Sequence, residues 1–183
     1  PEKRQFFTQN SDLFSDFGTG RDAQPFFSRR IGIAQDKNGN IIENKILAGV
    51  RLSGKINDDT RIGFLNVLTD EDIENEIAQN NNSLLTFRKK VFSRSNISLF
   101  FLNRENTKKY DFVDDSNRFN RVLGAEYNLA SNNGDWAGKA FLHKSFTSDK
   151  EKNEKDLTTG LMISKNSRKH FFMLYSAYVG DDF

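Results

Sequence analysis

Apolar and polar residues alternate along much of this chain with a period of two, the spacing of a β-strand whose two faces meet different surroundings. The clearest segment covers residues 46–56. Its apolar face holds Ile46, Ala48, Val50, Leu52, Gly54 and Ile56, and its other face holds Leu47, Gly49, Arg51, Ser53 and Lys55. This separation predicts a strand with one apolar and one polar face.

Further segments repeat the alternation with more noise. They cover residues 26–33, 61–68, 84–91, 96–101, 123–129, 136–143, 157–164 and 171–179. The last of them has the most apolar face, formed by Phe171, Met173, Tyr175, Ala177 and Val179. Together the segments predict about nine strands, each near the roughly 9 to 11 residues of a tilted transmembrane strand.

The polar breaks between these segments alternate in length. Long breaks cover residues 35–44, 70–82, 105–117 and 148–156, and short breaks cover residues 57–60, 93–95, 131–135 and 165–169. Outer-membrane β-barrels have long loops on the extracellular side and tight turns on the periplasmic side. We therefore predict an all-β fold, an antiparallel transmembrane β-barrel of the outer-membrane type, with the long breaks facing the cell exterior.

The strand count and the start of the chain predict a partial barrel. Bacterial single-chain barrels generally have an even number of strands, so an odd count indicates missing strands. The chain begins at Pro1 without a methionine or a signal peptide, so it is either a processed product or an excerpt of a longer chain, and we favour the excerpt. Residues 1–24 lack a sustained period of two, and we expect an irregular segment packed on or in the barrel. Residues 25–183 are expected to supply the barrel strands, with the barrel incomplete within them.

Composition is compatible with a membrane barrel and argues against several other classes of protein. The mean hydropathy is −0.68, and no run approaches the roughly 20 apolar residues of a membrane-spanning helix. A barrel strand escapes this test because it shows lipid only every second residue. The formal net charge of +2 argues against a nucleic-acid partner.

No metal or cofactor is predicted. The chain has no cysteine, and its two histidines, His143 and His170, lie outside any ligand spacing. Residues 36–43 are similar to a calcium-binding EF-hand loop, but Ile41 replaces the required glycine and Leu47 the required glutamate. The Asn38-Gly39 pair predicts a hairpin turn instead.

Charged residues on or near the expected polar faces are the candidates for lumen or ligand contacts. They are Arg29, Arg30, Arg51, Lys55 and Glu126. A guanidinium group pairs with carboxylate or phosphate in bidentate geometry, so Arg29 or Arg30 could clamp an anionic group in a polar lumen. The alternative, which we favour, is a structural network with Glu126 or loop aspartates. Because successive residues face opposite sides of a strand, at most one of the two arginines points into the lumen unless a bulge intervenes.

Several short motifs resemble a known family. They are Glu2-Lys3-Arg4-Gln5-Phe6-Phe7, Asp12-Leu13-Phe14 and Pro25-Phe26-Phe27-Ser28-Arg29-Arg30-Ile31-Gly32, followed by Gly63-Phe64-Leu65-Asn66-Val67-Leu68-Thr69, Arg94-Ser95-Asn96-Ile97, Asn120-Arg121-Val122-Leu123-Gly124 and Gly180-Asp181-Asp182-Phe183. The chain thereby resembles a Bacteroidota family of unassigned function, domain of unknown function 5916. Its members typically carry a module like the family-nine carbohydrate-binding modules before a predicted outer-membrane barrel. The resemblance implies an outer-membrane location in a Gram-negative cell and a carbohydrate-linked context, and it implies no catalytic residues.

These observations predict a non-enzymatic outer-membrane component that acts in transport, docking or surface assembly. Its expected partner is the lipid bilayer, with other outer-membrane proteins or glycans as further candidates. One alternative is a membrane anchor for a carbohydrate-binding or glycan-processing protein, and a glycosidase pair needs only two carboxylates at a separation that a sequence does not show. A second alternative is a soluble all-β binding domain built as a one-sided sandwich.

Overall fold

The computed structural model describes residues 5–19, 24–26, 30–148, 156–181 and 183. Two short helices, α1 (Gln5–Thr8) and α2 (Ser11–Ser15), precede a small hairpin of β1 (Ile33–Gln35) and β2 (Ile41–Glu43). Eight longer strands follow, with the 3-10 helix η2 (Asp115–Asn117) before the fifth of them. They are β3 (Ile46–Asn57), β4 (Thr60–Thr69), β5 (Asn80–Val91), β6 (Ser95–Asn106), β7 (Phe119–Ala130), β8 (Trp136–Thr147), β9 (Leu157–Asn166) and β10 (Phe171–Val179).

The eight longer strands form one sheet in which each strand lies beside its neighbours in sequence. All of its neighbouring strands are antiparallel, so the predicted all-β antiparallel class is confirmed. Within the described residues the sheet is open. Strand β3 pairs only with β4, and β10 pairs only with β9.

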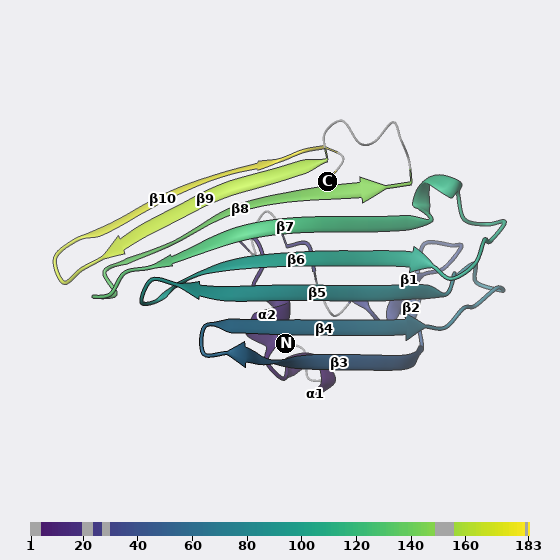
Figure 1. The fold of residues 1–183 in the computed structure, drawn as a ribbon. Coiled ribbons are helices and arrows are strands. Elements are labelled where there is room, and N and C mark those ends of the chain that lie inside the picture. Colours follow the sequence, from purple (N-terminus) through teal and green to yellow (C-terminus); the bar gives the residue numbers. More distant parts are fainter. Residues whose placement is uncertain (1–4, 20–23, 27–29, 149–155, 182) are drawn as a thin grey trace.

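The connections between strands separate by length, as the polar breaks predict. Short turns join β3 to β4, β5 to β6, β7 to β8 and β9 to β10 at one end of the sheet (Figure 1). The connections from β4 to β5, from β6 to β7 and from β8 to β9 leave from the other end and are longer. We call these two ends the short-turn end and the long-loop end.

The small hairpin lies at the long-loop end. Gln35 pairs with Ile41 across the predicted Asn38-Gly39 turn, where Gly39 has a φ of +86°. The Lys37 backbone amide donates to the carbonyl of Asn75 in the β4–β5 loop, 3.1 Å away, and this bond ties the hairpin to that loop. The predicted strand over residues 26–33 is wrong, because Phe26 and residues 30–32 are not in strand conformation and only Ile33 enters β1.

Helices α1 and α2 lie against one face of the sheet, which we call the inner face (Figure 1). Where irregular structure was expected, these helices form, but α2 has five residues and is far too short to be stable alone in water. Packing onto the sheet stabilises it instead. The resulting core joins Phe7, Leu13, Phe14, Phe17 and Ile31 to the strand residues Leu65, Val67, Leu84, Phe100 and Val122.

The apolar set of β10 also lies on the inner face, unlike the apolar sets of β3, β6, β7, β8 and β9. Ala177 is paired with Gly160, whose added Cβ would meet the buried ring of Phe141. The opposite face of β10 holds Phe172, Leu174 and Tyr178, all exposed. Both faces of β10 are therefore rich in apolar residues, and the period of two cannot distinguish inside from outside here.

Gly124 on β7 tests how tightly this core is packed. A Cβ at Gly124 would clash with the ring of Phe100, which packs against Phe17 at a centroid distance of 4.2 Å. We expect Gly124→Ala to lower the free energy of unfolding by about 2 kcal/mol, measured by urea denaturation. The control is Gly54→Ala on β3, where nothing lies within 4 Å of the added Cβ. Equal effects of the two substitutions would contradict this packing.

Candidate functional site

The outer face of the sheet is apolar and exposed over most of its width. Large apolar residues that point outward from all eight strands of the sheet expose 38% or more of their surface. They are Val50, Leu52, Ile56, Phe64, Leu85, Ile97, Leu99, Phe101, Leu123, Leu142, Leu161 and Tyr178. Soluble monomers rarely expose a large apolar surface of this kind.

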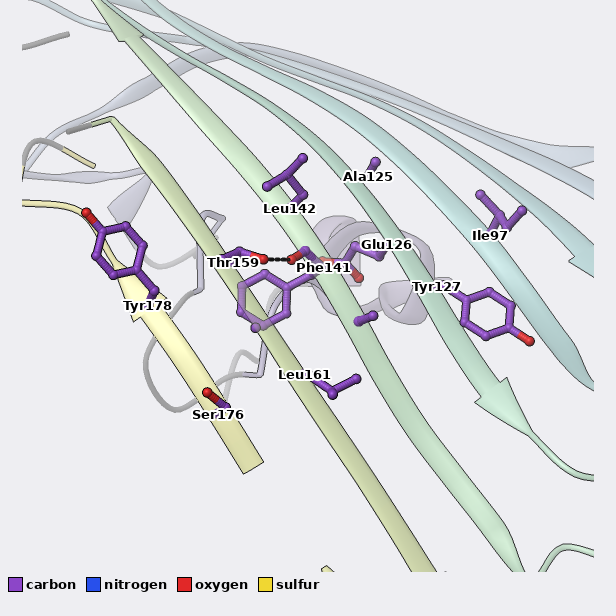
Figure 2. A pocket seen from close by; sticks show the side chains of 12 residues that line it. Ile97, Ala125, Glu126, Tyr127, Phe141, Leu142, Thr159, Leu161, Ser176 and Tyr178 are labelled. Carbon is purple, nitrogen blue, oxygen red and sulfur yellow. Dashed lines mark hydrogen bonds between the residues drawn. The ribbon is translucent and has the colours of Figure 1, made fainter. Parts of the chain in front are cut away.

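A shallow groove crosses this outer face between β6 and β10 (Figure 2). Its lining includes the small residues Ala125, Ala140 and Ser176 and the larger residues Tyr127 and Leu161. Phe141 and Glu126 also line the groove, but their side chains are buried on the inner face. The groove offers little polar chemistry, so it suits an apolar occupant better than a reaction.

The inner face holds a buried charged cluster around Glu126, on β7. The Glu126 side chain has no exposed surface, and its Oε1 lies 2.8 Å from Nε2 of the equally buried His143. The same oxygen accepts a hydrogen bond of 2.6 Å from the Gly18 backbone amide. Lys139 Nζ lies 3.4 Å from Glu126 Oε2 and 3.0 Å from Asp16 Oδ1. The cluster therefore joins strands β7 and β8 to the amino-terminal segment.

The His143 ring of this cluster is buried as completely as the Glu126 side chain. The His143 ring is packed between the rings of Phe100 and Phe141, each at a centroid distance of 4.9 Å. Both Glu126 and His143 lack exposed surface. Lys139 and His143 were not among the predicted site residues. They share the polar face of one strand, but their meeting with Glu126 depends on the register between β7 and β8.

Arginines on the inner face bind the amino-terminal segment at several points. The Arg51 guanidinium donates to the carbonyls of Phe6 and Gln9 and lies 4.2 Å from the ring centroid of Phe14. Arg61 and Arg88 both pair with the Asp12 carboxylate, at 2.6 and 3.4 Å. These contacts orient α2 on the sheet and leave the three guanidinium groups engaged.

The five predicted contact residues do not form one site. Arg51 and Glu126 bind the amino-terminal segment from different strands, Lys55 is exposed beside the β3–β4 turn, and Arg29 lies outside the described residues. Arg30 makes no ion pair with Glu126 or with another acid among the described residues. Arg30 instead lines two adjoining cavities of about 500 and 820 Å³ at the long-loop end of the inner face.

The described residues form neither a metal-binding cluster nor a membrane-spanning helix. Within the part of the chain that the structure describes, no group of three or more His, Asp or Glu residues is placed to hold a metal ion. Over the same residues, no helix is long and apolar enough to cross a membrane.

Comparison with known proteins gives no relative of this chain. No family model, no curated protein and no solved structure matches it. Its function is therefore argued from its own geometry.

The buried cluster generates a prediction about stability. Removing one member of a buried charge pair leaves the other unpaired in a low-dielectric interior. We expect Glu126→Ala to lower the free energy of unfolding by about 3 kcal/mol or more. The control is Glu105→Ala on β6, whose carboxylate pairs with Arg121 at 3.2 Å but is 41% exposed. An exposed pair of this kind contributes about 1 kcal/mol at most. Equal losses in urea denaturation would contradict the account.

Acid should loosen α2. The hydrogen bond from Arg61 and the charges of Arg61 and Arg88 hold the pKa of Asp12 below its usual value. The stabilisation is therefore complete above the unfolded pKa and is lost as the pH falls through the lower folded pKa. We expect hydrogen exchange at residues 5–15, corrected for intrinsic rates, to rise across this acid range.

Asp12→Asn separates this carboxylate from the others that titrate in acid. At pH 7 the backbone amides of residues 5–15 should exchange faster in this variant than in the parent chain, and acidification should speed their exchange less. The difference in the free energy of opening should be about 1 kcal/mol at most, because Asp12 is half exposed. Asp58→Asn, in the exposed β3–β4 turn, is the matched control. Identical profiles for the two variants would rule out the Asp12 contacts as the cause.

Proposed function

We propose that this chain is part of the wall of an outer-membrane β-barrel, with its outer face in lipid and its inner face toward the lumen. The observation that carries the proposal is the contrast between the two faces. The outer face exposes large apolar residues from most of the strands, while the inner face holds the Glu126 cluster and the Arg51, Arg61 and Arg88 contacts. Lipid-facing and lumen-facing residues alternate in this way along barrel strands.

Strand length and loop sidedness support the same proposal. Five strands have 12 residues, and the shortest of the eight has nine. Tilted transmembrane strands need roughly 9 to 11 residues. With short turns at one end and long loops at the other, the long-loop end is assigned to the cell exterior.

The amino-terminal segment would then lie inside the lumen as a partial plug. Its aromatic residues fill the inner face, and Asp12, Asp16 and the Gly18 amide bind charged groups of the strands. The edge strands β3 and β10 would pair with further strands, because lipid cannot satisfy unpaired backbone groups.

The proposed role is non-enzymatic: transport, docking or surface assembly. Its support is the burial of Glu126 and His143, because neither side chain of this pair has exposed surface. Anchoring a glycan-processing module would use the same barrel wall. The soluble alternative requires a second sheet over the outer face, and no layer covers that face within the described residues.

Tryptophan fluorescence tests the placement in lipid, because Trp136 is the sole tryptophan. In a Trp136→Phe background, we introduce Leu123→Trp on the outer face or Asn38→Trp in the exposed β1–β2 turn. For the full chain in bilayers, we expect brominated lipid to quench the tryptophan at position 123 strongly and the one at position 38 weakly. Acrylamide, a water-soluble quencher, should give the reverse order.

The alternative of a soluble all-β binding domain makes the opposite prediction. A chain that remains in solution without lipid or detergent, with acrylamide quenching a tryptophan at position 123 freely, would contradict the proposed function.

A further inference from the structure

The register of three strands places a polar row on the inner face at the long-loop end. Arg104 of β6 lies directly opposite Asn82 of β5 and Asn120 of β7. Side chains in such positions have Cβ atoms about 5 Å apart, so the guanidinium group has an amide on each side. All three residues line the cavity of about 500 Å³.

The next row of the inner face is apolar and lines the same cavity. It consists of Leu84, Leu102 and Val122, which also lie opposite one another across the three strands. The cavity is therefore lined by a polar row of side chains and, directly beside it, an apolar row. An occupant that satisfies both must have a polar end and an apolar face.

No acidic side chain offsets the positive charge of this cavity among the described residues that line it. Arg30 and Arg104 are the charged residues that line it, and neither makes an ion pair or side-chain hydrogen bond with a described residue. The amides of Asn82 and Asn120 are likewise unengaged. Arg61, Arg88 and Arg121, by contrast, all pair with carboxylates. Two guanidinium groups on one cavity without an acid match the geometry of a carboxylate or phosphate.

The adjoining cavity of about 820 Å³ contains a hydrogen-bond acceptor that lacks a donor among the described residues. It shares Arg30, Asn82 and Arg104 with the first cavity, and Asn106 also lines it. Asn106 is 7% exposed, and its Nδ2 donates to Asn80 Oδ1 at 3.3 Å, but its buried Oδ1 accepts no hydrogen bond within the described residues. A buried acceptor of this kind is costly unless a ligand hydroxyl or a water donates to it.

We propose that these cavities bind an anionic, hydroxyl-bearing ligand of the class of sugar acids and sugar phosphates. The acidic group pairs with Arg104 and Arg30, and the hydroxyls bond to Asn82, Asn120 and Asn106. The apolar face of the ligand rests on Leu102. Glu76 and Asp114 line the larger cavity but not the smaller one. Because their carboxylates would repel an anion, the acidic group of the ligand lies in the smaller cavity. The proposal goes beyond the barrel assignment and does not depend on it.

Calorimetric titration of the full chain with three probes tests the proposal: glucuronate, glucose 6-phosphate and glucose. We expect glucuronate or glucose 6-phosphate to bind at least about tenfold more tightly than neutral glucose, since hydrogen bonds to a charged group are the strongest in the site. The tighter of the two acids identifies the group as carboxylate or phosphate. Equal affinity for all three probes, or binding of none, would overturn the proposal.

Arg104→Gln should weaken binding of the acidic probe by about tenfold or more, and Arg104→Lys by less, because lysine keeps the charge but loses the bidentate fork. Arg168→Gln, in the exposed β9–β10 turn, is the control and should bind like the parent chain. If Arg104→Gln alters the thermal unfolding of the chain, Arg30→Gln replaces it, since Arg30 lies outside the sheet. Unchanged affinity in a folded variant at either arginine would overturn the proposal, whatever the result in bilayers.

Discussion

Packing of the amino-terminal segment onto the inner face is the contact on which the rest of this structure depends. A single sheet leaves both of its faces open, and the inner face of this one holds Glu126, Lys139 and His143 beside the large ring of Phe100. Phe17 covers that ring, while the Gly18 amide and Asp16 satisfy the charged groups next to it. Apolar burial and charge pairing are thus completed by the same short segment.

The two faces of the sheet follow from this arrangement. The inner face is buried and specific in its contacts, so a substitution there affects several partners at once. The outer face packs against nothing that the structure describes, and its apolar residues are exposed on most strands. A surface of this kind is stable where lipid takes the place of water, which links the fold to the proposed location in a membrane.

Much of this could be predicted from the sequence because a strand commits alternate residues to opposite faces. Val50 and Leu52 lie outward and Arg51 inward, as the alternation predicts. The alternation could not say which face of β10 lies inward, because both of its faces carry apolar residues, and the strand predicted over residues 26–33 was wrong. The alternation within one strand does not predict which residues of neighbouring strands meet. The Glu126–His143 pair and the row of Asn82, Arg104 and Asn120 depend on register, which no single strand specifies.

The central claim is that the sheet crosses a membrane with its long-loop end outside. The chain has no native cysteine, so single cysteines at two exposed positions report on the two ends: Asn38→Cys in the β1–β2 hairpin and Asn132→Cys in the β7–β8 turn. On intact cells that express the full protein, a membrane-impermeant maleimide should label position 38 at once and position 132 only after the outer membrane is permeabilised. Equal labelling of both positions before permeabilisation would contradict the account.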